Sequence, residues 1–239
     1  AIWRGEGSCR VVASTDKGAK WQLRGTATVP DPKDRNCDEP MIVEHPDGSL
    51  WQLVRTRYGI GESVSKDGGR TWTPVAPWNV EHPATRFFIR RLKSGNLLLV
   101  KHGPLKERTG RSHLTAYLSG DEGKTWQGGL LLDERGGVSY PDGVESEDGV
   151  IYVIYDFDRT GEKYIYMAVF TEQDILAGKC VNDRARLRVV VNKADGVNPG
   201  RGASSAPVKI EFGANDDGQP LLAGESALLE PETGRVEVV

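Results

Sequence analysis

The chain is organised around the sequence SKDGGRTW at residues 65–72, which recurs as SGDEGKTW at 119–126 and more loosely as STDKGAKW at 14–21. The shared pattern is S-x-D-x-G-x-T-W, with Lys20 in place of Thr in the first copy. This pattern predicts a tight turn between two strands: Gly takes positive φ, Asp accepts hydrogen bonds from backbone N–H groups, and Trp starts the next strand. The copies start 51 and 54 residues apart (65 − 14 and 119 − 65), a period that suits a four-stranded propeller blade.

Apolar segments with strand character surround the repeats in blade order. The expected strands are 8–14, 21–29, 41–44, 50–55, 63–65, 72–75, 87–92, 97–101, 114–119, 139–145, 150–155, 163–170 and 187–192. The blade that begins at residue 139 has no copy of the repeat. Residues 171–178 predict a helix of one or two turns, because Thr171 suits an N-cap and Gly178 a C-terminal stop.

The repeat resembles the Asp box, or BNR repeat, of the sialidase (neuraminidase) superfamily. This resemblance implies an all-β, six-bladed propeller with the boxes in peripheral turns, away from the active site. The chain accounts for about four blades, so we expect an incomplete propeller over residues 1–193 that lacks roughly the first two blades. Residues 194–239 stay unassigned, with a closing strand, a small appendage and disorder as alternatives.

Composition excludes several classes of protein. With 31 basic and 34 acidic residues the formal net charge is −3, which predicts no nucleic-acid partner. No apolar run approaches the roughly 18 residues of a membrane-spanning helix. Three scattered cysteines do not form a zinc signature, and we expect no metal or cofactor. Three separate buried thiols are the favoured state of Cys9, Cys37 and Cys180, with a Cys9–Cys37 disulfide as the alternative.

The resemblance also implies a mechanism. Sialidases act on a sugar whose anomeric carbon bears a carboxylate, so they use a tyrosine nucleophile activated by a glutamate, an exception to the usual pair of carboxylates. Three arginines bind the substrate carboxylate, and an aspartic acid transfers the proton. The aspartic acid and the first arginine lie in the family's opening blade, so no residue of this chain is assigned to either role.

Five residues match the family's site in order and in local context. Tyr140 occupies the place of the nucleophile, and Glu39 that of the activating glutamate. Arg55 and Arg111 match the second and third carboxylate-binding arginines, with Arg57 as a competitor of Arg55. The matches imply an exo-glycosidase for terminal acidic sugars such as sialic acid.

Alternatives remain open at each position. The charged residues could lie on a solvated rim, Tyr140 could be a core aromatic, and Pro141 departs from the small residue expected after the nucleophile. His82, His102 and Arg86 define another site, suited to a glycosidase or lyase for uronic acids or polysaccharides; ordinary hydrogen-bonded histidines are the plainer interpretation. A propeller that binds carbohydrate without catalysis is the third alternative. The expected partner is a glycan, the oligomeric state is left open, and the expected location is outside the cytoplasm.

Overall fold

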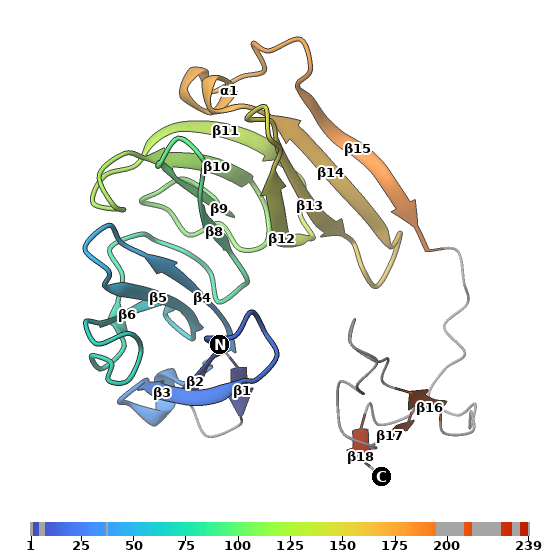
Figure 1. The fold of residues 1–239 in the computed structure, drawn as a ribbon. Helices are drawn as coiled ribbons and strands as arrows, with labels where there is room; N and C mark the ends of the chain where they lie inside the picture. Colours follow the sequence, from blue (N-terminus) through green and yellow to red (C-terminus); the bar gives the residue numbers. More distant parts are fainter. Residues whose placement is uncertain are drawn as a thin grey trace. The chain divides into compact units, whose positions relative to one another are not determined.

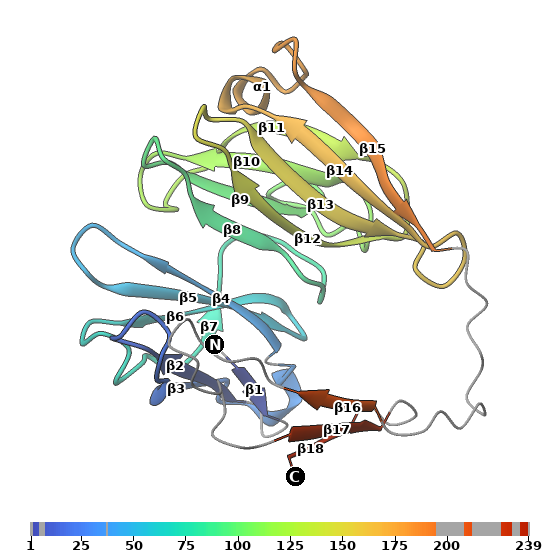
Figure 2. The same cartoon turned by 45° about the vertical axis from the view of Figure 1, so that its right-hand side comes forward.

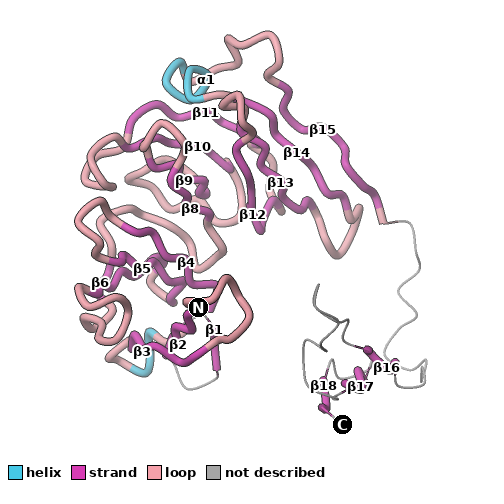
Figure 3. The backbone as a smooth tube through the Cα atoms, viewed as in Figure 1, coloured by secondary structure: helices cyan, strands magenta, loops and turns pink. Residues whose placement is uncertain are grey.

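The computed structural model describes residues 2–4, 8–36, 38–194, 208–211, 226–230 and 235–238. The chain divides into two compact units, Ala1–Ala194 and Asp195–Val239. The first unit is built from strands, with a 3-10 turn (Pro32–Asp34) and one short helix, α1 (Glu172–Ala177), as its helical elements among the described residues (Figure 3). No helix in these described segments is long and apolar enough to cross a membrane.

Four antiparallel sheets follow one another in the first unit, each with its strands in chain order (Figure 1). The first sheet contains β1 (Ile2–Arg4), β2 (Ser8–Ala13) and β3 (Gln22–Thr28). The second contains β4 (Asp38–Glu44), β5 (Leu50–Thr56), β6 (Gly59–Ser65) and β7 (Ala76–Pro77). The third contains β8 (Phe88–Arg91), β9 (Leu97–His102), β10 (Leu114–Ser119) and β11 (Gln127–Asp133). The fourth contains β12 (Val138–Glu145), β13 (Ile151–Phe157), β14 (Tyr164–Phe170) and β15 (Arg186–Lys193).

The sheets are arranged as the blades of a propeller. The first strand of each sheet contacts the first strand of the next, so β1 touches β4, β4 touches β8, and β8 touches β12. Successive sheets therefore lie face against face (Figure 2). Within the part of the chain that the structure describes, the four sheets form an open array, an incomplete β-propeller.

Apolar side chains fill the spaces between successive sheets, and β9 shows how. Its residues Leu97 and Leu99 belong to the core between the second and third sheets, while Leu98 and Val100 belong to the core between the third and fourth. Alternate residues of a strand face opposite sides of the sheet, so a strand covered on both faces needs an uninterrupted apolar run. Every residue of β9 is buried.

The Asp boxes form the predicted turns. In the second box the Ser65 hydroxyl accepts a hydrogen bond from the Gly69 N–H (2.8 Å) and donates one to the Asp67 carboxylate (2.8 Å). That carboxylate also accepts from the Thr71 N–H (2.9 Å) and the Thr71 hydroxyl (2.6 Å). These hydrogen bonds, of which those from Thr71 have the largest effect, hold the pKa of Asp67 far below its usual range. The third box forms the same hydrogen bonds. The first box forms them too, except for the bond from the Thr hydroxyl, because Lys20 stands in the place of Thr.

Strand β11 is an addition to the expected set, and it begins at two glycines that weaken its strand pattern. A side chain at Gly128 (φ +75°) would lie 2.3 Å from the Ile175 carbonyl oxygen of α1. The glycine therefore lets the helix pack directly against the strand. The expected helix is confirmed: Thr171 is its N-cap, Asp174 completes a capping box, and Gly178 ends it in the left-handed conformation.

The second unit contains a three-stranded antiparallel sheet of β16 (Val208–Glu211), β17 (Ser226–Glu230) and β18 (Arg235–Val238), which pair with one another. The cysteines differ from expectation. Cys9 is buried and disulfide-bonded, whereas Cys180 is a free thiol on the surface. The expectation of three separate buried thiols is therefore wrong. Cys37, named in the alternative pairing, lies outside the described residues.

Candidate functional site

The candidate residues gather at one end of the first unit because of a repeated register. The second strands of the three four-stranded sheets start at Leu50, Leu97 and Ile151. Five residues further on, at the last or the next-to-last position of the strand, lie three different ionisable side chains, Arg55, His102 and Asp156. Eleven residues before each of these starts lie Glu39, Arg86 and Tyr140, either in the first strand of the sheet or in the segment that leads to it. Equivalent positions in successive blades thus hold all six residues.

The Asp boxes lie at the opposite end. Strand β6 pairs Ile60 with Arg55 and then runs away from that end, until Ser65 pairs with Leu50. The second box begins at Ser65. Its position at the far end of the sheet agrees with a structural role for the boxes.

Glu39 and Tyr140 occupy matching β-bulges. In β4 the pairing passes from Asp38 opposite Arg55 to Met41 opposite Leu53, which leaves one extra residue on β4. In β12 it passes from Ser139 opposite Asp156 to Asp142 opposite Ile154, again with one extra residue. The bulges place Glu39 and Tyr140 in the left-handed region, with φ of +56° and +54°. This conformation costs a residue with a side chain roughly 1–2 kcal/mol.

A proline follows each strained residue. Pro40 and Pro141 have no N–H, and a bulge is a position where a strand tolerates this loss. Pro141, which departs from the family pattern, is thus the counterpart of Pro40 within this chain.

Glu39 is paired with Arg55. The Arg55 Nη1 donates to Glu39 Oε2 at 3.1 Å, and each side chain is only 15% exposed. Among the described residues no hydrogen bond joins Glu39 to Tyr140. The structure therefore brings Glu39 and Arg55 together and leaves the expected Tyr140–Glu39 contact unmade.

Two arginines approach the Tyr140 ring. The Arg159 Cζ atom lies 4.2 Å from the ring centroid and the Arg111 Cζ atom 6.0 Å from it, both within the range of cation–π attraction. Arg111 also donates from Nη1 to the hydroxyl of Ser139, the neighbour of Tyr140. Of the predicted arginines, Arg111 is the one beside Tyr140.

Asp156 holds Arg159 in place. Its Oδ2 forms an ion pair with Arg159 Nε at 3.1 Å, and its Oδ1 is buried without a hydrogen-bond partner among the described residues. Burial raises the pKa of Asp156, and the nearby Arg159 and Arg111 oppose this rise. Sequence reasoning missed both Asp156 and Arg159. The five-residue offset that leads to Arg55 would have located Asp156, whereas no local pattern marks Arg159.

His82 and His102 are buried, at 1% and 0% exposure. His102 bonds through Nε2 to the Val138 carbonyl (3.0 Å), so Nε2 must donate, and its Nδ1 lies 3.0 Å from the Thr85 hydroxyl and 3.4 Å from His82 Nε2. Burial lowers the pKa of His102 to about 4 and that of His82 well below its usual value. The pair is therefore neutral and internal. It supports the start of β12, two residues before Tyr140.

The remaining predicted arginines contact other groups. Arg86 donates to the Asp142 carboxylate (2.9 Å) across the third and fourth sheets. Arg57 is exposed, and its Nε donates to the Arg35 carbonyl (3.3 Å). No group of three or more histidine, cysteine or acidic residues suited to a metal ion occurs among the described residues.

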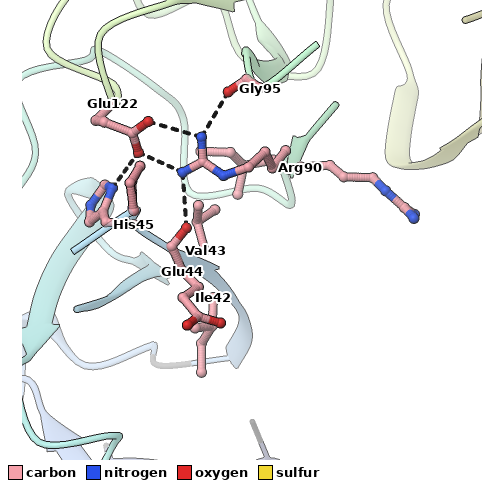
Figure 4. A pocket seen from close by; sticks show the side chains of 10 residues that line it. Ile42, Val43, Glu44, His45, Arg90, Gly95 and Glu122 are labelled. Atoms are coloured by element: carbon pink, nitrogen blue, oxygen red, sulfur yellow. Dashed lines mark hydrogen bonds and ion pairs between the residues drawn. The ribbon is translucent and has the colours of Figure 1, made fainter. Parts of the chain in front are cut away.

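A pocket of about 700 Å³ lies at the Asp-box end, between the second and third sheets (Figure 4). Glu122 of the third box is its centre: it binds Arg91 (2.5 Å) and His45 (2.6 Å), and Arg91 also donates to the Glu44 carbonyl (2.9 Å). Arg91, then His45, lowers the pKa of Glu122. Because these side chains bind one another across two blades, they link the second sheet to the third at this pocket.

Comparisons with known proteins give one family and several structures. The family model described as BNR repeat-like domain matches residues 5–153. Similar solved structures include a protein of unknown function from Dyadobacter fermentans (14% identity, TM-score 0.47, 92% of this chain and 63% of that one). They also include an endo-arabinase from Bacteroides thetaiotaomicron (15%, 0.48, 92% and 80%) and a Hadza microbial sialidase (16%, 0.46, 96% and 49%).

The chain thus spans 63% of the first of these structures and about half of the sialidase. No curated protein matches the sequence. The family model covers more than half of the chain, including all three Asp boxes and the residues from Glu39 to Tyr140. The protein belongs to the BNR repeat-like domain family.

Proposed function

We propose that the first unit carries the substrate-binding end of a carbohydrate-active propeller, a retaining exo-glycosidase for terminal acidic sugars such as sialic acid. One observation carries the proposal: Glu39 and Tyr140, the two residues that the sialidase resemblance names for the chemistry, occupy equivalent strained bulges at one end of the unit. Left-handed residues with side chains cluster at functional sites, because the surrounding structure must maintain a costly conformation.

In the proposed reaction the Tyr140 oxygen bonds to the anomeric carbon while the glycosidic bond to the leaving-group oxygen breaks and the aglycone departs as an alcohol; water then hydrolyses the covalent glycosyl–enzyme intermediate. A neutral phenol avoids the repulsion that the substrate carboxylate would exert on a carboxylate nucleophile. A free phenol ionises near pH 10, so a base must accept its proton. The general acid is left unassigned.

Glu39 is the proposed base, and its contact with Arg55 suggests how substrate would recruit it. Arg55 is proposed to bind the substrate carboxylate together with Arg111, through charge-assisted hydrogen bonds. When Arg55 turns to the substrate, its bond to Glu39 Oε2 is released. The freed carboxylate then accepts the Tyr140 proton.

Hydrolysis of a fluorogenic sialoside by the full chain tests the proposal. Tyr140→Phe removes the nucleophilic oxygen and is expected to lower kcat at least 1,000-fold, a loss of about 4 kcal/mol in transition-state stabilisation. Tyr152→Phe, on the neighbouring strand β13, is the matched control and is expected to retain activity. Full activity in Tyr140→Phe would exclude the mechanism.

A binding propeller without catalysis is the second candidate. The Glu39–Arg55 pair favours it, since Glu39 is not hydrogen-bonded to Tyr140. Glycan binding with no turnover would support this candidate. The polysaccharide enzyme built on His82 and His102 is disfavoured, because both rings are buried and bonded internally.

We also propose an extracytoplasmic location. Cys9 is disulfide-bonded, and structural disulfides persist in oxidising compartments. Fractionation of the native source checks this proposal: recovery of the protein in the reducing cytoplasm, with Cys9 as a free thiol, would contradict it.

A further inference from the structure

The fourth sheet has one face that no described strand of the first unit covers (Figure 2). Its other face packs on the third sheet, and there Ile151, Val153 and Tyr155 of β13 are buried in the core between the two sheets. Successive residues of a strand point to opposite sides, so the residues between these three lie on the uncovered face. On that face Ile154 is 45% exposed and Val144 of β12 is 55% exposed. The fourth sheet therefore exposes large apolar side chains.

Strand register assembles apolar side chains into two rows across this face. One row crosses β12, β13 and β14, and the next crosses β13, β14 and β15. The rows consist of Val144, Tyr152 and Val169, and of Ile154, Met167 and Val189. We call these six residues the outer face. Single apolar residues on a surface are normal, whereas a contiguous apolar patch marks an interaction site.

Two positions of the outer face are interface positions in the earlier sheets. Tyr152 and Ile154 are the second and fourth residues of β13. The second and fourth residues of β5 are Trp51 and Leu53, and those of β9 are Leu98 and Val100. The next sheet covers each of these four side chains, which are at most 5% exposed. The fourth sheet thus has the side chains of a blade-to-blade interface, but Ile154 stays 45% exposed.

The size of the outer face sets the strength expected of a contact there. Neighbouring strands lie about 4.8 Å apart and each residue adds about 3.3 Å along a strand, so four strands of about seven residues present a face of roughly 19 by 23 Å. A standard protein–protein interface buries about 800 Å² on each partner. The outer face is smaller than this, so we expect a weak, reversible contact.

The chemistry of the two end sheets selects the occupant of the outer face. A sheet that covers this face must itself be apolar. The first sheet is largely polar on the side that points away from the second sheet, where β2 and β3 place Arg10, Thr26 and Thr28, next to Val12 and Leu23 at the Asp-box end. Head-to-tail packing of the fourth sheet on the first sheet of another copy would desolvate these polar side chains. The outer face of a second copy matches without this cost, and two identical faces close by a two-fold axis.

We propose that the protein forms a two-fold symmetric dimer in which the outer faces of two copies pack against each other. The dimer continues, between two copies, the packing that joins successive sheets within one copy. Asp156 lies two residues beyond Ile154, on the same side of β13, so the dimer contact borders the candidate site. The proposal rests on strand register and burial, and it is independent of the proposed glycosidase mechanism.

Sedimentation velocity of the full chain measures the dimer directly. Between about 1 and 200 µM the mass is expected to rise from 26.2 kDa toward twice that value, because association depends on protein concentration. Ile154→Glu places a carboxylate in the apolar contact and is expected to raise the Kd of the dimer by a factor of about 10 or more. Val190→Glu is the matched control: Val190 is 55% exposed and pairs with Tyr166, so it lies on the other side of the same sheet.

Two further measurements keep the test decisive. Val144→Glu is a second variant of the outer face, which carries the test if circular dichroism shows that Ile154→Glu is misfolded. Sodium chloride at about 0.5 M screens ion pairs and is expected to leave the apolar contact intact. A monomer at every concentration, an unchanged Kd in the outer-face variants, or dispersal of the dimer by salt would overturn the proposal. Species larger than a dimer would exclude the two-fold arrangement.

Discussion

Glu39 and Tyr140 share one backbone conformation at one position of their blades: each is the extra residue of a bulge in an inner strand, with φ of +56° and +54°. Neither residue is one that tolerates the left-handed region well. Two blades therefore maintain the same strain at the end of the unit where the candidate side chains meet.

The strain at Tyr140 is measurable by comparing two truncations. Tyr140→Gly and Tyr140→Ala both remove the ring, but glycine adopts positive φ without a steric cost. Tyr140→Gly is expected to be more stable to urea than Tyr140→Ala by about 1 kcal/mol. At Val144, on the same strand but outside the left-handed region, the order is expected to reverse. Equal stabilities of the two Tyr140 variants would show that the bulge relaxes without cost.

The Glu39–Arg55 pair is expected to be energetically coupled. Both side chains are largely buried, so water and salt screen the attraction between their charges only weakly. A double-mutant cycle of Glu39→Gln and Arg55→Met in urea unfolding is expected to give a coupling energy of about 1–2 kcal/mol. In the native protein the Arg57 Nε contacts a backbone carbonyl. The effects of Glu39→Gln and Arg57→Met are therefore expected to be additive. Additivity in both cycles would mean that the Glu39–Arg55 bond contributes nothing to stability.

The buried histidines predict a loss of stability in mild acid. Folding lowers the pKa of His102 from 6.5 to about 4, so between these pH values the unfolded chain binds a proton that the folded chain does not. Stability is therefore complete above pH 6.5 and falls as the pH is lowered toward 4, by up to roughly 3 kcal/mol for this group. His82, whose pKa is also lowered by burial, changes stability in the same direction.

Urea unfolding at pH 7 and pH 4.5 checks this expectation. His102→Gln keeps a donor for the Val138 carbonyl and is expected to show a smaller difference between the two pH values than the wild type. His113→Gln, at an exposed position, is expected to show the wild-type difference. A wild-type pH dependence in His102→Gln would rule out His102 as a source of the acid sensitivity.

The first Asp box predicts a stabilising substitution. Asp16 lacks the hydroxyl donor that Thr71 and Thr125 supply to the other two boxes, because Lys20 stands in that place. Lys20→Thr is expected to raise Tm in a thermal melt, and Thr71→Lys to lower it by removing the same bond. Opposite or absent shifts in both variants would show that the hydroxyl bond is not what stabilises the turn.

Much of the fold is predictable from sequence because its signals are local. The hydrogen bonds of the Asp boxes join residues at most four positions apart, so the pattern S-x-D-x-G-x-T-W contains the whole turn. The helix at Glu172–Ala177 is equally local, since its N-cap, capping box and C-terminal glycine are adjacent in the chain. Strand β11 was hidden by a close approach: Gly128 makes room for α1, and that contact is not visible in the strand pattern.

The candidate site depends on both the sequence and the tertiary structure. Residue order and family resemblance named Tyr140, Glu39, Arg55 and Arg111, and the turn spacing fixes their common end of the blades. The partner of each side chain is a tertiary matter. Glu39 binds Arg55 across 16 residues, and Arg159 reaches Tyr140 across a strand pair and a turn. Sequence by itself determined the blades, because turns and apolar alternation act within a few residues. Only the packed structure decided which charged side chains pair, because the bulges, the strand register and burial together set the distances between them.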